Sequence, residues 1–114
     1  MSITDSFDPV GKPLITPAAA YLKSPYSLDV CVINFSQKIM DALTDDGVVE
    51  LLEAERIRCV ACYFPIYRVR GTNIGVVRTT VGAPITATLT EEISYVYSCR
   101  KFVMFGSCGG LDSS

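Results

Sequence analysis

Residues 101–111 read KFVMFGSCGGL, an apolar run that ends in a glycine-rich loop. An apolar run followed by small residues is typical of a buried strand that delivers a loop to its carboxyl end. Loops at that end of a parallel sheet are where α/β proteins hold their ligands. This stretch therefore predicts an α/β fold with a ligand-binding loop after residue 105.

The segment before this stretch completes a strand, a helix and a second strand. Ile74–Thr80 is rich in β-branched residues, Pro84 suits the first turn of a helix, and Phe102–Phe105 is the second strand. The helix is expected to reach about Ser98 because it carries an apolar stripe of Ile85, Leu89, Ile93, Val96 and Tyr97. A unit of this size predicts parallel, neighbouring strands with a right-handed crossover. It brings residues 79–82 and 106–109 to one edge of the sheet.

The earlier part of the chain divides into an arm and the start of the domain. Residues 1–27 hold four of the six prolines and are expected to be extended, so the domain is placed at residues 28–114. A strand is predicted at Val30–Ile33, and then a helix at Gln37–Leu43 with Ser36 as its N-cap. Another helical turn or two is expected within Val48–Glu55.

The middle of the chain reads as β structure. Strands are predicted over Ile57–Phe64 and Ile66–Val69, with Pro65 between them as a bend or edge marker. Arg70–Asn73 forms a turn, so the runs on either side of it are expected to pair as a hairpin.

The composition describes one small domain. The chain has 114 residues, 49% hydrophobic content and a net charge of -2. This is enough apolar material for a core, and the charge gives no reason to expect nucleic acid or an anionic membrane as partner. No apolar run approaches the roughly 18 residues of a membrane span. The amino terminus lacks the features of a secretory signal, so a cytoplasmic protein is expected.

The cysteines favour packing over metal or disulfide chemistry. Five are present, an odd number, and most lie in apolar segments, as free thiols in a reducing compartment do. Cys59 and Cys62 form a C-x-x-C motif, but neither a second pair nor any histidine exists to complete a zinc site. No metal is therefore predicted, and histidine-based catalysis by this polypeptide is excluded.

The two glycine-containing loops are suited to an anion. Backbone N–H groups in such loops converge on phosphate, and the hydroxyls of Thr80 and Ser107 add donors. The helix after Gly82 offers free N–H groups and the positive end of its dipole. The spacing matches neither a P-loop nor G-x-G-x-x-G, so a phosphate or a set of sugar hydroxyls is the expected guest. Stacking on a base is an option for Tyr63 and Tyr67, whereas helix packing is favoured for Tyr95 and Tyr97.

Three segments together carry a resemblance: Val81-Gly82-Ala83-Pro84, Glu91-Glu92 and Phe105–Leu111. This combination resembles the nucleoside phosphorylase family, which includes purine nucleoside and uridine phosphorylases, in a divergent bacterial branch. The resemblance implies a three-layer α/β fold with a mixed twisted sheet, of which residues 28–114 are the N-terminal half. It also implies nucleoside salvage, with phosphate as co-substrate, no further cofactor, and a homo-oligomer.

The resemblance further implies roles for individual residues. Those expected to contact substrate are Thr80, Val81, Ser107, Cys108 and Gly109, and those expected to contact phosphate are Gly106, Ser107, Lys38 and Arg58. Arg58 has an alternative interpretation as a solvated strand end. The family's phosphate-binding arginine falls on Met104, which cannot bind an anion. A nucleosidase that uses water is therefore the alternative activity.

The length sets a second alternative. Members of the family are about twice this size, and their ribose-binding Met-Glu segment and base-protonating Asp lie in the other half. We therefore expect this chain alone to be inactive, as a remnant that binds ligand or associates with copies of itself through an exposed sheet edge. A small α/β binding module is a third interpretation.

Overall fold

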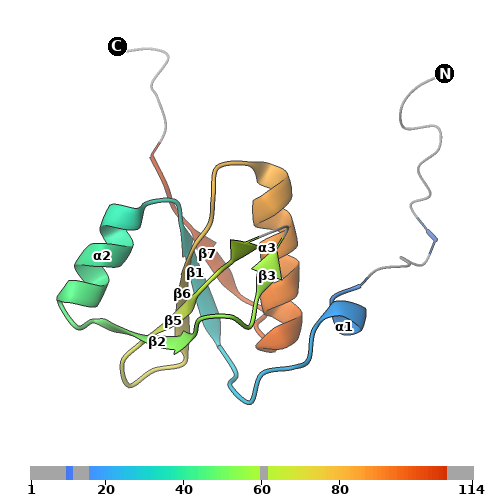
Figure 1. Ribbon diagram of the computed structural model, residues 1–114, viewed down its shortest axis with the longest axis horizontal. Coiled ribbons are helices and arrows are strands. Elements are labelled where there is room, and N and C mark those ends of the chain that lie inside the picture. Colours follow the sequence, from blue (N-terminus) through green and yellow to red (C-terminus); the bar gives the residue numbers. More distant parts are fainter. Residues whose placement is uncertain (1–9, 12–15, 60–61, 108–114) are drawn as a thin grey trace, which may run out of the picture.

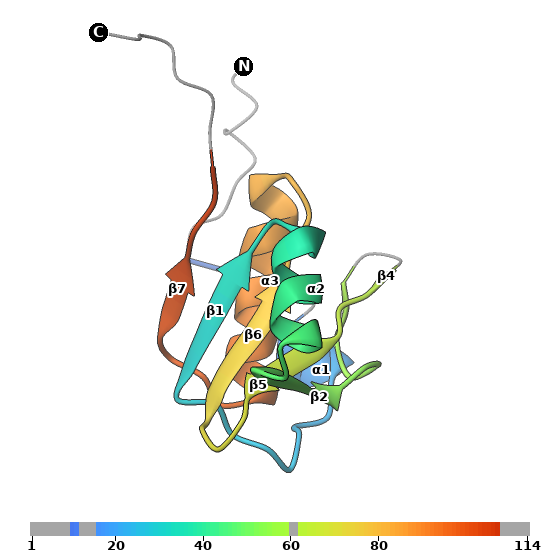
Figure 2. The same ribbon diagram turned by 90° about the vertical axis from the view of Figure 1, so that its left-hand side faces the viewer.

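A strand from early in the chain lies at the centre of the parallel part of the sheet. The computed structural model describes residues 10–11, 16–59 and 62–107. In it β1 (Val30–Asn34) runs parallel to both of its neighbours, β6 (Ile74–Arg78) and β7 (Phe102–Met104). β5 (Ile66–Val69) pairs antiparallel with β6, and β2 (Val49–Glu53) antiparallel with β5. The result is a five-stranded mixed sheet in the order β2-β5-β6-β1-β7 (Figure 2).

The predicted pairing of β6 with β7 is wrong. Their connecting helix, α3 (Ala83–Val96), passes over β1, which lies between them. The physical reason is the composition of β1: it is apolar, and Cys31 and Ile33 are fully buried, which is typical of a central strand in a parallel sheet. The predicted hairpin around Arg70–Asn73 is confirmed by the β5–β6 pairing.

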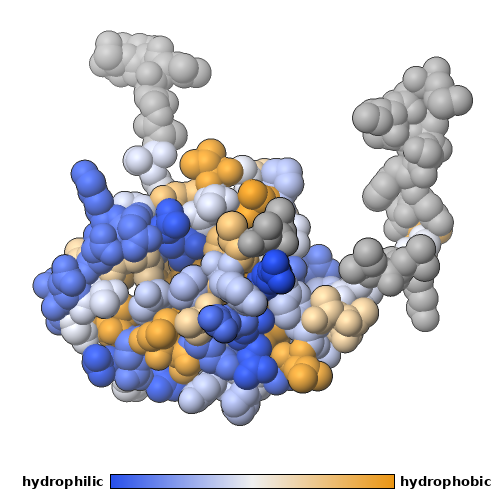
Figure 3. Space-filling view, in the orientation of Figure 1, coloured by the Kyte–Doolittle hydropathy of each residue, from blue (hydrophilic) through white to orange (hydrophobic). Residues whose placement is uncertain are grey.

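Helices cover both faces of the sheet. Figure 2 shows α2 (Gln37–Asp45) in front of the sheet and α3 behind it. The α3 side holds the larger core, which contains Leu28, Cys31, Ile33, Ile57, Phe64, Ile66, Val77, Leu89, Ile93, Val96, Tyr97 and Cys99. On the α2 side Met40 packs with Val49 and Val76. Hydrophilic side chains gather over the outer surface of α2 (Figure 3).

The two long helices begin where the sequence predicts. Ser36 caps α2 by accepting a hydrogen bond from the Ile39 N–H, and the helix runs two residues past the predicted Leu43. α3 begins after Gly82, whose φ of 131° favours glycine, and Pro84 lies in its first turn. The burial of Tyr97 in the core confirms its predicted packing role.

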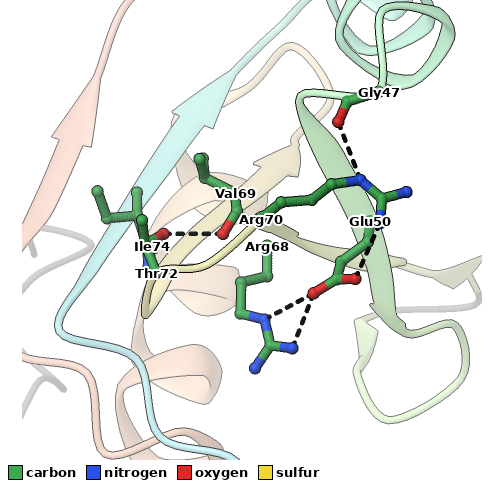
Figure 4. Close-up of polar contacts among 7 residues, drawn as sticks. All are labelled: Gly47, Glu50, Arg68, Val69, Arg70, Thr72 and Ile74. Atoms are coloured by element: carbon green, nitrogen blue, oxygen red, sulfur yellow. Dashed lines mark hydrogen bonds and ion pairs between the residues drawn. The ribbon is translucent and has the colours of Figure 1, made fainter.

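β2 replaces the helical turns predicted within Val48–Glu55. The Arg68 guanidinium of β5 donates to the Glu50 carboxylate of β2 at 2.8 Å, and Arg70 lies 3.3 Å from the same carboxylate (Figure 4). Arg70 also donates to the Gly47 carbonyl at 2.9 Å. These cross-strand contacts form only in the folded sheet, so local sequence preference does not reveal them.

A small hairpin and a one-turn helix complete the structure. The predicted single strand over Ile57–Phe64 is wrong, because β3 (Arg58–Cys59) and β4 (Cys62–Tyr63) pair antiparallel as a separate sheet. Within the first 27 residues, where an extended arm is expected, α1 (Pro17–Ala20) forms a helical turn capped by Thr16. Figure 1 shows α1 beside the lower half of α3.

Candidate functional site

The carboxyl ends of three parallel strands meet at one edge of the sheet. In Figure 1 the loops that follow β1, β6 and β7 all leave the sheet at its upper end. These loops hold Phe35–Ser36, Thr79–Gly82 and Phe105–Ser107. The prediction that the loops after β6 and β7 share an edge is therefore confirmed, with the loop after β1 between them. Ligands in α/β sheets bind at this edge.

A buried polar cluster beneath the edge fixes the loops after β1 and β6. Asn34 is fully buried, donates to the Val77 carbonyl at 3.3 Å, and accepts from the Ser36 N–H at 3.1 Å. The backbone carbonyl of Asn34 accepts from the Thr79 N–H at 2.8 Å. The hydroxyl of Thr79 lies 3.1 Å from that of Thr86 on α3. Because buried polar groups are costly unless paired, this network holds the loops in one geometry.

Phe35 joins the loop after β1 to the loop after β7. A Cβ placed on Gly106 would lie 3.1 Å from the Phe35 ring, so the ring packs against a backbone that has no side chain to displace it. The ring is still partly exposed, at 37%. Gly106 therefore provides close contact with Phe35, in addition to any contact with a ligand.

An apolar groove of about 760 Å³ runs between α3 and the free edge of the sheet. It is lined by Phe35, Gly82, Ala83, Thr86, Ala87, Thr90, Glu91, Ser94, Phe102 and Met104. Met104 occupies the position where the resemblance would place an arginine, and its side chain lines this groove. The groove therefore receives no cation from β7.

The predicted substrate residues lie at the exposed end of this edge. Thr80 and Ser107 are exposed. Val81 is 90% exposed, so its side chain has little contact with the described residues. Cys108 and Gly109 lie outside the described residues.

The two predicted phosphate-binding cations differ in position. Lys38 is exposed in the first turn of α2, directly after the loop that follows β1. Arg58 is exposed on β3, with its guanidinium 5.6 Å from the centre of the Tyr63 ring and its carbonyl accepting from the Tyr21 hydroxyl. Lys38 thus shares the edge with the loops, whereas Arg58 belongs to the separate hairpin.

Sequence reasoning missed Arg78. It is the last residue of β6 and lines a second cavity, of about 290 Å³, together with Gln37 and Thr80. The available signal in the sequence was a cation at the end of the apolar run Ile74–Val77, directly before the Thr79–Gly82 segment.

Burial favours the uncharged forms of several ionisable side chains of the domain. Burial raises the pKa of the Cys31 thiol to about 12, and burial also raises the pKa of Cys99. Neither thiol is a nucleophile at neutral pH, because the thiolate is the reactive form. Burial likewise raises the pKa of Glu92.

Within the described residues no group of three or more acidic, cysteine or histidine side chains is placed to hold a metal ion. None of the helices in this part of the chain has the length and apolar character needed to cross a membrane.

Comparison with known proteins gives no assignment. The chain matches no protein-family model, and no curated protein matches it. The function must therefore be argued from the site itself.

Proposed function

We propose that this chain is a nucleoside phosphorylase-like protein of nucleoside salvage, acting on an N-glycosidic bond with phosphate as the acceptor. The observation that carries the proposal is the meeting of three loops, after β1, β6 and β7, at one carboxyl edge. The loops and the start of α2 offer the groups that phosphate and ribose require: the N–H groups and hydroxyl at Gly106–Ser107, the hydroxyl of Thr80, and the cation Lys38 in the first turn of α2.

In this proposal the parts of the substrate contact different regions of the edge. The exposed loops offer donors for phosphate and sugar hydroxyls, and the groove beside α3 offers an apolar surface next to them. Glu91, which lines the groove, is a hydrogen-bond acceptor for ring or ribose donors. In this role the protein is cytoplasmic and uses phosphate without a further cofactor.

The test combines binding with chemistry. Calorimetry with inosine and uridine, with and without phosphate, measures occupancy, and chromatography measures the released base. Nucleoside binding that phosphate strengthens supports the proposal. Base release only with phosphate identifies a phosphorylase, and release without it a nucleosidase. Absence of binding for both nucleosides and for phosphate would overturn the proposal.

A matched pair of variants ties the binding to the edge. Ser107→Ala removes a hydroxyl from the loop after β7 and is expected to weaken phosphate binding about tenfold. Ser27→Ala removes an exposed hydroxyl from the segment before β1 and is expected to leave binding unchanged.

A second candidate function, self-association, is favoured by the free edge of β7. The Lys101 carbonyl and the Phe105 N–H form hydrogen bonds with β1. The backbone polar groups of the odd-numbered residues of this segment therefore face β1. The N–H and C=O groups of Phe102 and Met104 therefore point away from the sheet. Val103, between them, is 53% exposed. An exposed apolar edge of this kind is a template for another strand.

The free groups specify one symmetric pairing. In an antiparallel pair of two β7 strands, Phe102 of one copy opposes Met104 of the other, and both exchange two hydrogen bonds. The two copies of Val103 then lie opposite each other on the α2 side. We expect a dimer by light scattering, with Val103→Lys monomeric and Val48→Lys, at an exposed apolar position near β2, still dimeric. A monomeric wild-type chain would exclude this pairing.

A further inference from the structure

A cavity of about 290 Å³ lies on the α2 side of the sheet, where β6 ends. Three parts of the chain enclose it: the start of α2, the segment from β4 to β5, and the end of β6 with the loop that follows. Its lining residues are Gln37, Met40, Cys62, Tyr63, Phe64, Pro65, Tyr67, Arg78 and Thr80. Thr80 also belongs to the carboxyl edge described above, so the cavity shares one residue with the candidate site.

The cavity is positively charged. Arg78 is its lining cation, and no carboxylate is among the residues that line it. Three other arginines have acidic partners: Arg56 pairs with Glu53, and Arg68 and Arg70 pair with Glu50. The Arg78 side chain makes neither an ion pair nor a hydrogen bond within the described residues. An unpaired guanidinium with five donors is suited to a phosphate group, which it can bind in a bidentate manner.

The remaining walls are suited to a planar ring. Of the lining aromatic residues, Tyr63 is half exposed, Tyr67 packs on the apolar cluster around Met40, and Phe64 is buried. Aromatic side chains stack on flat rings through their faces, and the phenol hydroxyls add donors. The hydroxyl of Thr80 lies on the same cavity as Arg78.

We propose that Arg78 binds a phosphate group in this cavity, next to a planar ring held by Tyr63 and Tyr67. The inference rests on the proposed function, because a phosphate co-substrate needs a cation and Met104 stands where the resemblance would place an arginine. Arg78 is the cation that we assign to this role. The phosphate has two possible sources, free phosphate beside a nucleoside and the ester phosphate of a nucleoside monophosphate. In both, an anionic phosphate group presents oxygen acceptors to Arg78.

Calorimetry with four probes tests the inference: inorganic phosphate, AMP, UMP and adenosine. If the ring and phosphate are one molecule, AMP or UMP binds at least about tenfold more tightly than adenosine or phosphate. If they are separate, phosphate binds alone and strengthens adenosine binding. Equal binding of adenosine and AMP, with no binding of phosphate, would overturn the proposal.

Arginine variants assign the effect to one side chain. Arg78→Met is expected to weaken binding of the phosphate-bearing probe about tenfold to a hundredfold, and Arg78→Lys less, since a point charge remains. Arg100→Met is the matched control, because Arg100 is also exposed and unpaired in the described residues but follows α3. Equal affinities for Arg78→Met and Arg100→Met would contradict the assignment.

The two proposals fail in different ways. If phosphate binding depends on Arg78 but no base is released from any nucleoside, the assignment of Arg78 stands and the proposed activity is wrong. If base is released and Arg78→Met releases it as the wild type does, the activity stands and Arg78 has no part in phosphate binding.

Discussion

Replacing Asn34 tests whether the buried polar cluster holds the candidate site together. Asn34→Ala removes the acceptor of the Ser36 N–H, at 3.1 Å, and the donor to the Val77 carbonyl, at 3.3 Å. Asn34 is fully buried, so water does not replace these contacts without cost. One buried group left without a partner costs about 1–3 kcal/mol. We expect a loss of about 2–3 kcal/mol in the free energy of unfolding.

Urea unfolding measures this loss. With a slope of roughly 1–3 kcal/mol per molar urea for a small domain, the midpoint falls by about 1 M. Asn73→Ala is the matched control, because Asn73 is exposed in the turn before β6, and we expect it to stay within about 0.5 kcal/mol of the wild type. A loss below about 0.5 kcal/mol for Asn34→Ala, or equal losses for both variants, would refute the reasoning.

Asn34→Asp sharpens the test. The carboxylate still accepts from the Ser36 N–H but faces the Val77 carbonyl without a proton to donate. A buried charge opposite an acceptor costs more than a missing group, so this variant is expected to be less stable than Asn34→Ala at pH 7. Its carboxyl has a raised pKa, so its stability is expected to recover as the pH falls.

Three further outcomes are expected. The hydrogen bond from Arg68 lowers the pKa of Glu50 below its ordinary value, so the ion pair stabilises the fold above that ordinary pKa and is lost as the pH falls through the lowered one. The gap in thermal midpoint between wild type and Glu50→Gln should therefore close in acid. Thr86→Val removes a buried hydroxyl contact and should cost about 1 kcal/mol by urea unfolding, more than the same change at exposed Thr88. Cys62→Ser should remove a fast-reacting thiol from titration with an aromatic disulfide under native conditions, whereas Cys31→Ser should not, because Cys31 is buried with a pKa of about 12. A wild-type trace unchanged by Cys62→Ser would contradict that assignment.

Elements with a strong local pattern were predictable from the sequence. α3 carries an apolar stripe and a proline at its start, and α2 has a capping serine, so both begin where expected. β2 was not predictable, because the charges that place it, Glu50 and Arg68, lie 18 positions apart and meet only across a strand pair.

The site was partly predictable for the same reason. Its loops follow strands that the apolar runs indicate, so the shared edge at Thr80 and Gly106 followed from the parallel arrangement. The cavity lined by Arg78 did not follow, because Tyr63 and Tyr67, which also line it, come from a segment that local patterns place only as a strand. Strand order is likewise a property of the whole sheet.

The central place of β1 has a consequence for how the chain folds during synthesis. Val30 pairs with Ile74, and Cys31 with Phe102, so the most buried strand is made early and gains its partners late. Pairings of this range slow folding, since the intervening loop must close before any contact offsets its cost. While the chain emerges from the ribosome, the apolar side chains of β1 have no sheet to enter. A chaperone that binds short apolar segments would find its site there until β6 is made.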